Sequence, residues 1–414
     1  MKYLKYLLLL LIIIPIPIKA KEIDPDFPDL YSENAILYNM TTDEVLYEEN
    51  PDKQVAIASL TKIMTTIIAI ENIDDIQKTV TIPEQGLAGL KEANASVAGF
   101  KLNDKVTYED LLYGALLPSG GDATQTLAYY IAGSNENFVK LMNEKASELN
   151  LKNTHFSDPT GLDDHNNYST VRDVSTILKY ALENETFKEI FTTQEYTTSN
   201  NLNLKSTLYY NTHNYNLNNL YIYGSKTGFT DIAGFCLATI AKNDDTEFLL
   251  VTTGAPYETR YPYHFVDAIN IYNYYTDNYH YLNLLDTNDN IISLDTKYSK
   301  EDKYNYKPNE TTSIYVKNNI TKENLTYNYE GIKTVTPFTK QEQIGTLTIT
   351  LDNETLKTVP IIYNGTLTLS LLSLIMDNLI YLIGTIILIT IIIILIIKKK
   401  KNKKRRKKRK YSKR

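Results

Sequence analysis

An uninterrupted apolar run near the C-terminus constrains this 414-residue chain more than any other feature. Residues 379–397 contain no charged side chain over 19 positions. As a helix they would extend about 28 Å at 1.5 Å per residue, which is close to the hydrocarbon thickness of a bilayer. We therefore expect a transmembrane helix here and look for the folded part of the chain before it.

The segment after this run is strongly basic. Residues 398–414 contain 14 Lys or Arg and no acidic residue. Such a cluster stays on the cytoplasmic side of a membrane-spanning helix. We expect a single-pass protein of the plasma membrane, with this tail in the cytoplasm and the preceding chain outside it. A nucleic-acid-binding tail is the alternative, but stop-transfer and attraction to anionic lipid explain the charges with fewer assumptions.

The N-terminus has the order of residues found in secretory signal peptides. Lys2 and Lys5 precede an apolar run over 7–14, and the small residue Ala20 follows. We expect residues 1–20 to be a signal peptide that is cleaved after Ala20. A retained N-terminal anchor is the alternative, although the run is short for a bilayer span.

Charge and cysteine content narrow the class of protein further. Without the 14 tail charges and the four lysines at the N-terminus, 25 basic residues remain against 49 acidic ones. This excess of acid argues against nucleic acid as a partner. Cys236 is the only cysteine, which excludes an internal disulfide and a cysteine-based zinc site. Since the five histidines show no metal-ligand spacing either, we expect neither a metal nor another cofactor.

Helical patterns in the middle of the chain, with strand patterns on either side, predict one α/β domain over residues 21–284. Two short strand-like runs, 35–38 and 45–47, predict a hairpin that joins the later strands in an antiparallel sheet flanked by helices. Helices are expected after Ser59 and after Thr107 and over 135–149, 171–182 and 263–275; further strands are expected over 221–223, 235–241 and 246–253.

From about residue 285 the helical signals disappear. Residues 313–316, 345–351 and 358–362 are rich in strand formers and lie between polar turns. This pattern predicts a small all-β sandwich domain over 285–366. We see no chemistry in it, so its expected role is to hold the first domain away from the membrane.

Three short motifs occur in one order along the first domain. They are Ser59-Leu60-Thr61-Lys62, Ser119-Gly120-Gly121 and Lys226-Thr227-Gly228. Each motif alone is a weak signal. Their context is more specific, because the first lies at the start of a predicted apolar helix and the third lies on a predicted strand.

The first motif can carry nucleophilic chemistry. Residues three apart on a helix share a face, so Lys62 Nζ can reach Ser59 Oγ. A serine hydroxyl needs a base, and no histidine lies nearby in the sequence. An amine can serve if burial and a neighbouring positive charge lower its pKa, and Lys226 could supply that charge. The simpler alternative is a helix-capping Ser59 and a solvated Lys62.

These motifs and their surroundings resemble the D-alanyl-D-alanine carboxypeptidases, which are low-molecular-mass penicillin-binding proteins of serine peptidase family S11. The resemblance covers roughly residues 30–285 and continues faintly into the β domain at 345–347. It rests on the stretches 58–65, 116–120, 161–164, 168–170, 224–228 and 233–236.

The resemblance implies a transpeptidase-like fold and a serine mechanism on peptidoglycan stem peptides. Ser59 would attack the carbonyl between two terminal D-alanines, with Lys62 as general base. β-Lactam antibiotics would acylate the same serine. The resemblance also implies that Ser119 relays protons. Lys226 and Thr227, in the Lys-Thr-Gly motif that ends at Gly228, would bind the substrate carboxylate. The backbone N–H groups of Ser59 and Phe229 would form the oxyanion site.

The second motif departs from the family pattern. The family usually has Ser-x-Asn, and the third place here is Gly121. In the family that Asn hydrogen-bonds the catalytic lysine and the substrate amide, so its role is unfilled in this chain. The adjacent Asp122 is interpreted as a first-turn residue of a helix over 122–132. We expect an active enzyme that is slower than its relatives.

Anchoring departs from the family as well, since many relatives lie on the membrane through an amphipathic C-terminal helix. Residues 379–397 are apolar all round and should span instead. Arg260 follows a predicted strand and is one of two arginines before the tail. A surface ion pair is the simpler interpretation of Arg260, and binding of a carboxylate is the alternative.

Two other functions use the same residues. A class A β-lactamase shares the three motifs, but it needs a well-placed Glu for deacylation and seldom has a second domain. We find no convincing Glu motif between Ser119 and Lys226. A wall-binding protein with impaired catalysis is the third hypothesis, and Gly121 is the feature that motivates it.

Overall fold

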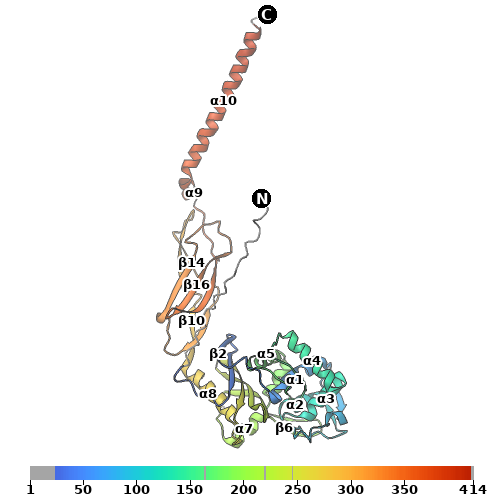
Figure 1. Cartoon of the computed structure of the whole chain (residues 1–414). Helices are drawn as coiled ribbons and strands as arrows, with labels where there is room; N and C mark the ends of the chain where they lie inside the picture. Colours follow the sequence, from blue (N-terminus) through green and yellow to red (C-terminus); the bar gives the residue numbers. More distant parts are fainter. Residues whose placement is uncertain (1–23, 163–164, 219–220, 245, 412–414) are drawn as a thin grey trace, which may run out of the picture. The chain divides into compact units, whose positions relative to one another are not determined.

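A computed structural model describes residues 24–411, except 163–164, 219–220 and 245 (Figure 1). The expected signal peptide over 1–20 lies outside the described residues. The chain divides into two compact units, and the boundary falls between Asn278 and Tyr279. This boundary precedes the expected one at 284/285, because the strand that begins at Tyr279 pairs within the second unit.

The first unit is built on a five-stranded antiparallel sheet with the order β2-β1-β9-β8-β7. The predicted hairpin forms and joins the later strands, since β1 pairs with both β2 and β9. The strands are β1 Asn34–Asn39, β2 Glu44–Glu49, β7 Ile222–Thr230, β8 Gly234–Asn243 and β9 Thr246–Ala255.

Helices cover the sheet. The expected helices after Ser59 and Thr107, and those expected over 135–149, 171–182 and 263–275, are all present. They are α1 Thr61–Asn72, α2 Tyr108–Leu116, α3 Gly121–Ala132, α4 Asn135–Glu148, α5 Val171–Leu182, α6 Glu185–Thr192, α7 Thr207–Tyr215 and α8 Tyr263–Asn278. Shorter elements are η1 Ala58–Leu60, β3 Thr79–Thr81, η2 Glu84–Gly86, β4 Lys105–Thr107, β5 Glu195–Thr197 and β6 Asn203–Lys205.

Alternating residues of β9 pack against different helices. Leu249 and Val251 belong to the main core, which α1 fills with a nearly continuous row of buried residues. Phe248 instead meets Tyr272 of α8, with ring centroids 5.9 Å apart. The sheet therefore lies between α8 and the helices that surround α1, as expected when strand side chains alternate between faces.

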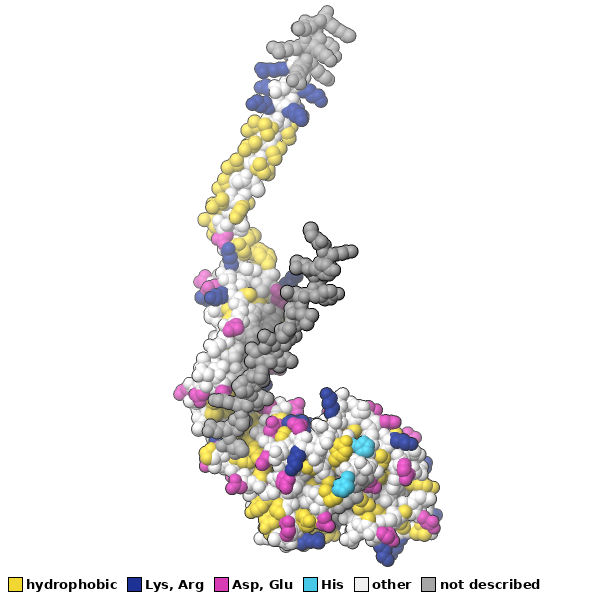
Figure 2. Space-filling model, in the orientation of Figure 1, with side chains coloured by type: hydrophobic (Ala, Val, Ile, Leu, Met, Phe, Trp, Pro, Cys, Tyr) yellow, Lys and Arg dark blue, Asp and Glu magenta, His cyan; other side chains and the backbone are white. Residues whose placement is uncertain are grey.

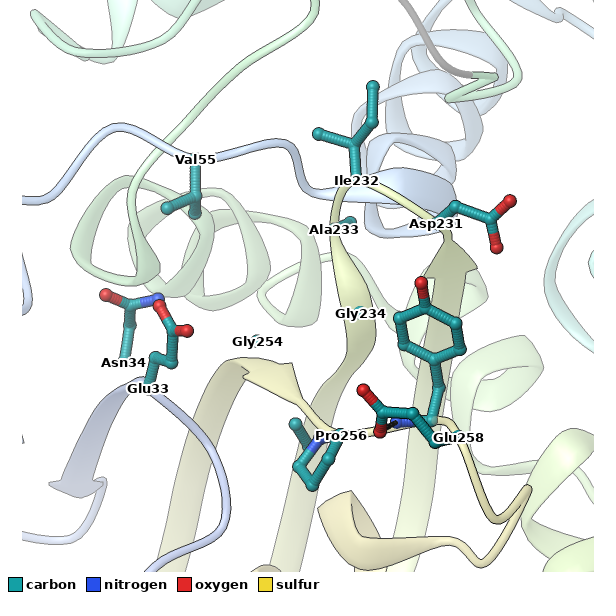
Figure 3. A pocket seen from close by; sticks show the side chains of 12 residues that line it. Glu33, Asn34, Val55, Asp231, Ile232, Ala233, Gly234, Gly254, Pro256 and Glu258 are labelled. Carbon is teal, nitrogen blue, oxygen red and sulfur yellow. Dashed lines mark hydrogen bonds between the residues drawn. The ribbon is translucent and has the colours of Figure 1, made fainter.

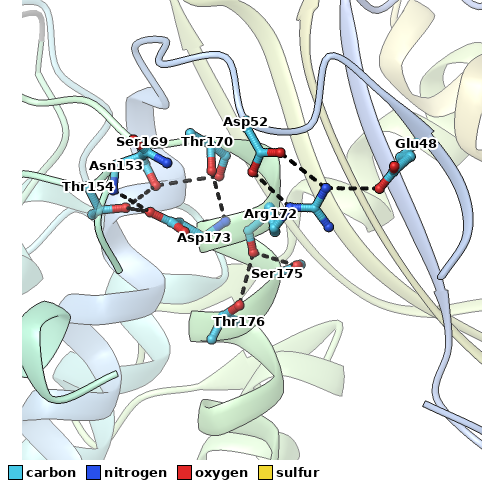
Figure 4. A network of polar contacts seen from close by, with 10 residues as sticks. All are labelled: Glu48, Asp52, Asn153, Thr154, Ser169, Thr170, Arg172, Asp173, Ser175 and Thr176. Atoms are coloured by element: carbon cyan, nitrogen blue, oxygen red, sulfur yellow. Dashed lines mark hydrogen bonds and ion pairs between the residues drawn. The ribbon is translucent and has the colours of Figure 1, made fainter. Parts of the chain in front are cut away.

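The segment before Ser59 is tied to the start of α5 (Figure 4). Arg172 holds Asp52 with two hydrogen bonds, of 2.8 and 3.2 Å, and Glu48 with a third of 2.9 Å. Val55 and Ser169 exchange backbone hydrogen bonds in both directions. Two points of attachment thus fix the chain just before it enters η1 and presents Ser59.

The second unit begins with an all-β domain, as the sequence predicts. Three small sheets, β10-β13, β12-β11-β15 and β14-β16-β17, share one hydrophobic core. The elements are β10 Tyr279–Leu285, β11 Ile292–Thr296, β12 Lys303–Tyr306, β13 Thr312–Lys317, η3 Lys322–Asn324, β14 Leu325–Gly331, β15 Thr334–Val335, β16 Gln343–Leu351 and β17 Glu354–Ile362.

Two helices follow in this unit, α9 Leu371–Asp377 and α10 Leu379–Tyr411. Apolar side chains cover the first part of α10, and Lys and Arg side chains follow (Figure 2). Its span from Leu379 to Arg405 is long and apolar enough to cross a membrane. The apolar side chains are exposed, as in Ile380 at 83%, which fits a helix whose surroundings are lipid rather than protein.

Candidate active site

The first motif brings a hydroxyl and a buried amine together. Ser59 lies in η1, just before α1, and Lys62 is only 3% exposed. Lys62 Nζ is 2.9 Å from Ser59 Oγ and donates to the Thr160 carbonyl at 2.6 Å. The alternative of a capping serine and a solvated lysine is wrong, because Leu60 occupies the N-cap of α1 and Lys62 is buried.

The second and third motifs also meet. Lys226 on β7 is fully buried and donates to Ser119 Oγ at 2.8 Å and to the Thr227 carbonyl at 2.7 Å. Ser119 has a φ of +64°, and Ala58, just before the nucleophile candidate, has a φ of +46°. Left-handed backbone is uncommon for residues with a Cβ and concentrates at functional sites.

Strand β7 runs close against η1. A Cβ at Gly228 would lie 3.0 Å from the Ser59 backbone nitrogen and from the Ile57 carbonyl oxygen. The absence of a side chain at Gly228 therefore allows this approach. It brings the Lys-Thr-Gly motif beside the nucleophile candidate, so the three sequence motifs converge on one place.

Burial lowers the pKa of both lysines. Desolvation brings the pKa of Lys62 down to about 8, although the carboxylates of Asp158 and Asp122 oppose this shift. Desolvation and then repulsion from Lys62 place the pKa of Lys226 well below its usual value. Burial, rather than the charge of Lys226 proposed from the sequence, is thus the main reason that Lys62 can lose its proton.

Asp122 does not replace the missing Asn. Its buried carboxylate accepts the backbone N–H groups of Ala98, Gly99 and Phe100 at 2.8, 2.9 and 3.0 Å. It lies in the first turn of α3, as interpreted from the sequence. It therefore fastens the 98–100 segment to the start of α3 rather than presenting a polar atom to a substrate.

Leu90 fills the place where a side chain at position 121 would begin. A Cβ on Gly121 would lie 2.8 Å from Leu90 Cδ2 and 3.3 Å from the Ser96 carbonyl oxygen. Leu90 is itself 3% exposed, so it has little room to move. An Asn at this position would therefore require the buried side chain of Leu90 to shift.

The sequence did not predict the contribution of the turn over 158–162. Thr160 supplies a carbonyl to Lys62, and Asp158 holds this turn through several hydrogen bonds. The stretch 161–164 contributed to the family resemblance but had no role assigned; Asp163 and Asp164 lie outside the described residues. The Asp-Pro-Thr-Gly sequence was the available signal for a tight turn.

Phe229, near the end of β7, lies close to Arg260 of the loop between β9 and α8. The guanidinium carbon of Arg260 is 5.8 Å from the Phe229 ring centre, and Tyr257 meets the same ring edge-on at 5.1 Å. Among the described residues Arg260 has no ion-pair partner, so the expected surface ion pair is not found there. Arg260 instead lies over the residue that follows Gly228.

A cavity of about 270 Å³ lies beside the turn between β7 and β8 (Figure 3). The residues that line it include Glu33, Asp231 and Glu258, and they include none of the three motifs. It is therefore separate from the place where the motifs converge. No group of three or more His, Cys, Asp or Glu side chains that could hold a metal ion occurs in the part of the chain that the structure describes.

A comparison with protein families decides the assignment. The family model Peptidase S11, described as D-alanyl-D-alanine carboxypeptidase, matches residues 20–257. The chain belongs to this family. A second model, described as the C-terminal domain of penicillin-binding protein 5, matches residues 279–368. Its first residue coincides with the start of the second structural unit.

Individual relatives agree with this assignment. D-alanyl-D-alanine carboxypeptidase DacF of Bacillus subtilis is 30% identical over 347 residues, which cover 80% of this chain and 84% of the relative. Penicillin-binding protein 5 from Haemophilus influenzae superimposes with a TM-score of 0.63 at 25% identity and covers 82% of this chain and 98% of its own. A Streptomyces K15 DD-transpeptidase variant gives a TM-score of 0.54 at 29% identity, over 60% of this chain and 98% of its own.

The S11 assignment confirms the resemblance, the transpeptidase-like α/β fold and the β domain that follows it. It also makes the chain a serine hydrolase of the D-alanyl-D-alanine carboxypeptidase type, whose family works through an acyl-enzyme. This outcome favours a D-alanyl-D-alanine carboxypeptidase over a β-lactamase.

Proposed function

We propose that Ser59 is the nucleophile that removes the terminal D-Ala from peptidoglycan stem peptides ending in D-Ala-D-Ala. One observation carries the proposal: the Ser59 hydroxyl lies 2.9 Å from the amine of a lysine that is almost completely buried. Once neutral, that amine can accept the hydroxyl proton as Oγ attacks the peptide carbonyl.

The remaining steps follow from the groups around Ser59. Backbone N–H groups of Ser59 and Phe229 stabilise the negative oxygen of the tetrahedral intermediate. The amine of the leaving D-Ala takes up a proton through Ser119, and the C–N bond breaks to leave an ester on Ser59. Water then hydrolyses this ester, which releases the shortened peptide and restores the serine hydroxyl.

Lys226 and Thr227 bind the carboxylate of the terminal D-Ala. Two buried ammonium groups repel each other, so the lysine pair holds both protons poorly. A substrate carboxylate beside Lys226 favours the charged form there, and repulsion then favours neutral Lys62. Substrate binding in this way prepares the base.

Arg260 adds a second positive charge near this carboxylate. It lies over Phe229, next to Gly228, and has no ion-pair partner among the described residues. Replacement by Ala should raise KM for the peptide several-fold and change kcat little, because the cation acts on binding rather than on bond breaking. An unchanged KM in steady-state assays would remove Arg260 from the site.

The proposed location follows from the two ends of the chain. α10 anchors the protein in the plasma membrane, and the 14 basic residues after 397 remain in the cytoplasm. The signal peptide over 1–20 directs the S11 domain and the β domain to the other side, where peptidoglycan and β-lactams are found. Here the β domain acts as a spacer.

The test is release of D-Ala from a pentapeptide by the full-length protein in detergent. We expect wild-type protein to release one D-Ala per peptide and Ser59→Ala to release none. Penicillin turnover without D-Ala release would support a β-lactamase instead. If the folded wild-type protein does neither, it is a wall-binding protein with impaired catalysis.

A further inference from the structure

The turn over 158–162 holds a carbonyl against the amine of Lys62. Lys62 Nζ is 2.6 Å from the Thr160 carbonyl oxygen, which is closer than its 2.9 Å distance from Ser59 Oγ. A carbonyl oxygen only accepts hydrogen bonds, so one N–H of Lys62 must point toward it. A neutral amine fixed by that N–H can direct its lone pair toward the serine hydroxyl.

Asp158 fixes the position of this carbonyl. Its Oδ1 accepts the backbone N–H groups of Thr160 at 2.6 Å, Gly161 at 2.7 Å and Leu162 at 3.3 Å. The Thr160 hydroxyl donates to the same oxygen. Gathering three successive N–H groups on one carboxylate oxygen directs the peptide units of the turn and leaves the Thr160 carbonyl facing α1.

The same turn is docked on the nucleophile segment at two further points. The Pro159 carbonyl accepts the hydroxyl of Thr65 at 2.7 Å, one helical turn after Lys62. Gly161 has a φ of +76°, and a Cβ there would lie 2.1 Å from the Ala58 carbonyl oxygen. Consecutive carbonyls of the turn therefore contact α1, while its glycine lies against the residue before Ser59.

Position 121 cannot orient the amine in this chain. Gly121 has no side chain, and Leu90 occupies the space where one would begin. The Thr160 carbonyl is thus the acceptor, apart from Ser59 itself, that the described residues place against Lys62 Nζ.

We infer that Asp158 is a positioning residue for Lys62. Asp158 holds the Thr160 carbonyl against the amine of Lys62 and so performs the orienting task that position 121 leaves unfilled. The inference rests on the proposed role of Lys62 as the base. Asp158 acts through the Thr160 carbonyl, because it contacts the turn and not the reacting atoms.

The charged groups that face Lys62 provide a second way to test the role of Asp158. They are Asp158 and Asp122, which favour the ammonium form of Lys62, and Lys226, whose own pKa is lowered by repulsion from Lys62. Removing the charge of Asp158 should lower the pKa of Lys62, because a neighbouring negative charge stabilises the protonated amine. A residue with a purely structural role in a distant turn would not move this pKa.

The experiment measures the second-order rate of penicillin acylation against pH for full-length protein in detergent. Asp158→Asn keeps an oxygen acceptor in place and removes the charge, whereas Asp158→Glu keeps the charge and moves the acceptor. We expect Asp158→Asn to retain the plateau rate within about threefold, and the rise of its rate with pH (the acid limb) to lie at lower pH. The plateau rate of Asp158→Glu should fall at least about tenfold.

Asp75→Asn is the matched control, because Asp75 also accepts a backbone N–H, from Gln77, but in an exposed turn. It should leave the plateau and the acid limb unchanged, and thermal melting shows that each variant is folded. A wild-type rate for Asp158→Glu, an equal loss in both Asp158 variants, or an unmoved acid limb in Asp158→Asn would overturn the inference. Formation of a penicillin adduct by the wild-type protein tests the proposed function. The ratio of the acylation rates of variant and wild type tests the role of Asp158.

Discussion

Lys62 and Lys226 are two amines that the fold has removed from water without giving either an ion pair with a described residue. A buried lysine without a counter-ion loses its proton more readily than a solvated one. Their partners are instead neutral oxygens, the hydroxyls of Ser59 and Ser119 and two backbone carbonyls. This arrangement suits proton transfer, because each amine can gain or lose a proton without breaking an ion pair.

The rate of acylation should therefore rise with pH. Burial lowers the pKa of Lys62 to about 8, and the proposed mechanism uses its neutral amine as the base. Acylation of the free enzyme should then be slow below this pH and reach a plateau above it. Stopped-flow measurement of penicillin acylation from roughly pH 6 to pH 10 checks this. A rate that falls with pH over this range would mean that the charged form of Lys62 is the active one.

Restoring the family's usual residue at position 121 should not restore its function. Gly121→Asn places a Cβ 2.8 Å from Leu90 Cδ2, so we expect a loss of stability of about 1–3 kcal/mol and no faster acylation. The double variant Gly121→Asn with Leu90→Ala makes room and should recover part of the stability. Denaturant unfolding compares the two, and a single variant as stable as wild type would show that the site is more open than the packing indicates.

At the scale of elements, the start of α3 is held by a carboxylate rather than by a capping hydroxyl. Asp122 is fully buried and accepts three N–H groups from the 98–100 segment. Since α3 begins directly after Ser119 and Gly120, this contact also fixes the second motif. Stability and the position of the site thus depend on the same side chain.

Replacing Asp122 by Ala should cost about 3 kcal/mol or more, because the N–H groups of Ala98, Gly99 and buried Phe100 lose a charged acceptor that is itself fully buried. Asp75→Ala removes one exposed hydrogen bond to a backbone N–H and should cost less than about 0.5 kcal/mol. Chemical denaturation of both variants tests the difference. Equal losses would indicate that water replaces the carboxylate of Asp122.

Local signals were sufficient to predict the strands of the main sheet and most of the helices around it, but not α6, α7 or the short strands β3 to β6. Thr107 and Asp110 form a capping box at α2, and Thr170 caps α5, so both helices begin where the sequence predicts. Long-range contacts are different, because no local pattern specifies them. The Lys62–Thr160 hydrogen bond joins residues 98 positions apart, and it was therefore not predicted.

The candidate site was predicted in part for the same reason. The Ser59–Lys62 contact follows from helical spacing, and family resemblance grouped the three motifs. The packing of Leu90 against Gly121 and the hydrogen bonds from the 98–100 segment to Asp122 could be identified only in the folded chain. Both involve segments for which the sequence predicted no element. Sequence patterns thus identified the proposed reacting groups, and the structure identified the groups that contact them.

At the scale of the whole molecule, the three motifs and the candidate membrane span belong to separate units. All three motifs lie in residues 1–278, and α10 belongs to residues 279–414. The β domain has its own hydrophobic core, so it does not depend on α10 for its packing. We therefore expect the anchor to set location and not chemistry.

A chain that ends at residue 368, where the second family model ends, should be soluble and acylate at the wild-type rate within about twofold. Ultracentrifugation of membranes and a fluorescent penicillin measure the two properties. The full chain should sediment with membranes, and the shortened chain should remain in the supernatant. A shortened chain that still sediments would locate another anchor outside α10.

The identity of the acylated residue tests the central claim most directly. Full-length protein is treated with penicillin, digested and analysed by mass spectrometry, beside Ser59→Ala. The proposed mechanism predicts one covalent adduct, on the peptide that contains Ser59, and no adduct in the variant. An adduct on another residue, or an equal adduct in Ser59→Ala, would contradict the assignment of Ser59 as the nucleophile.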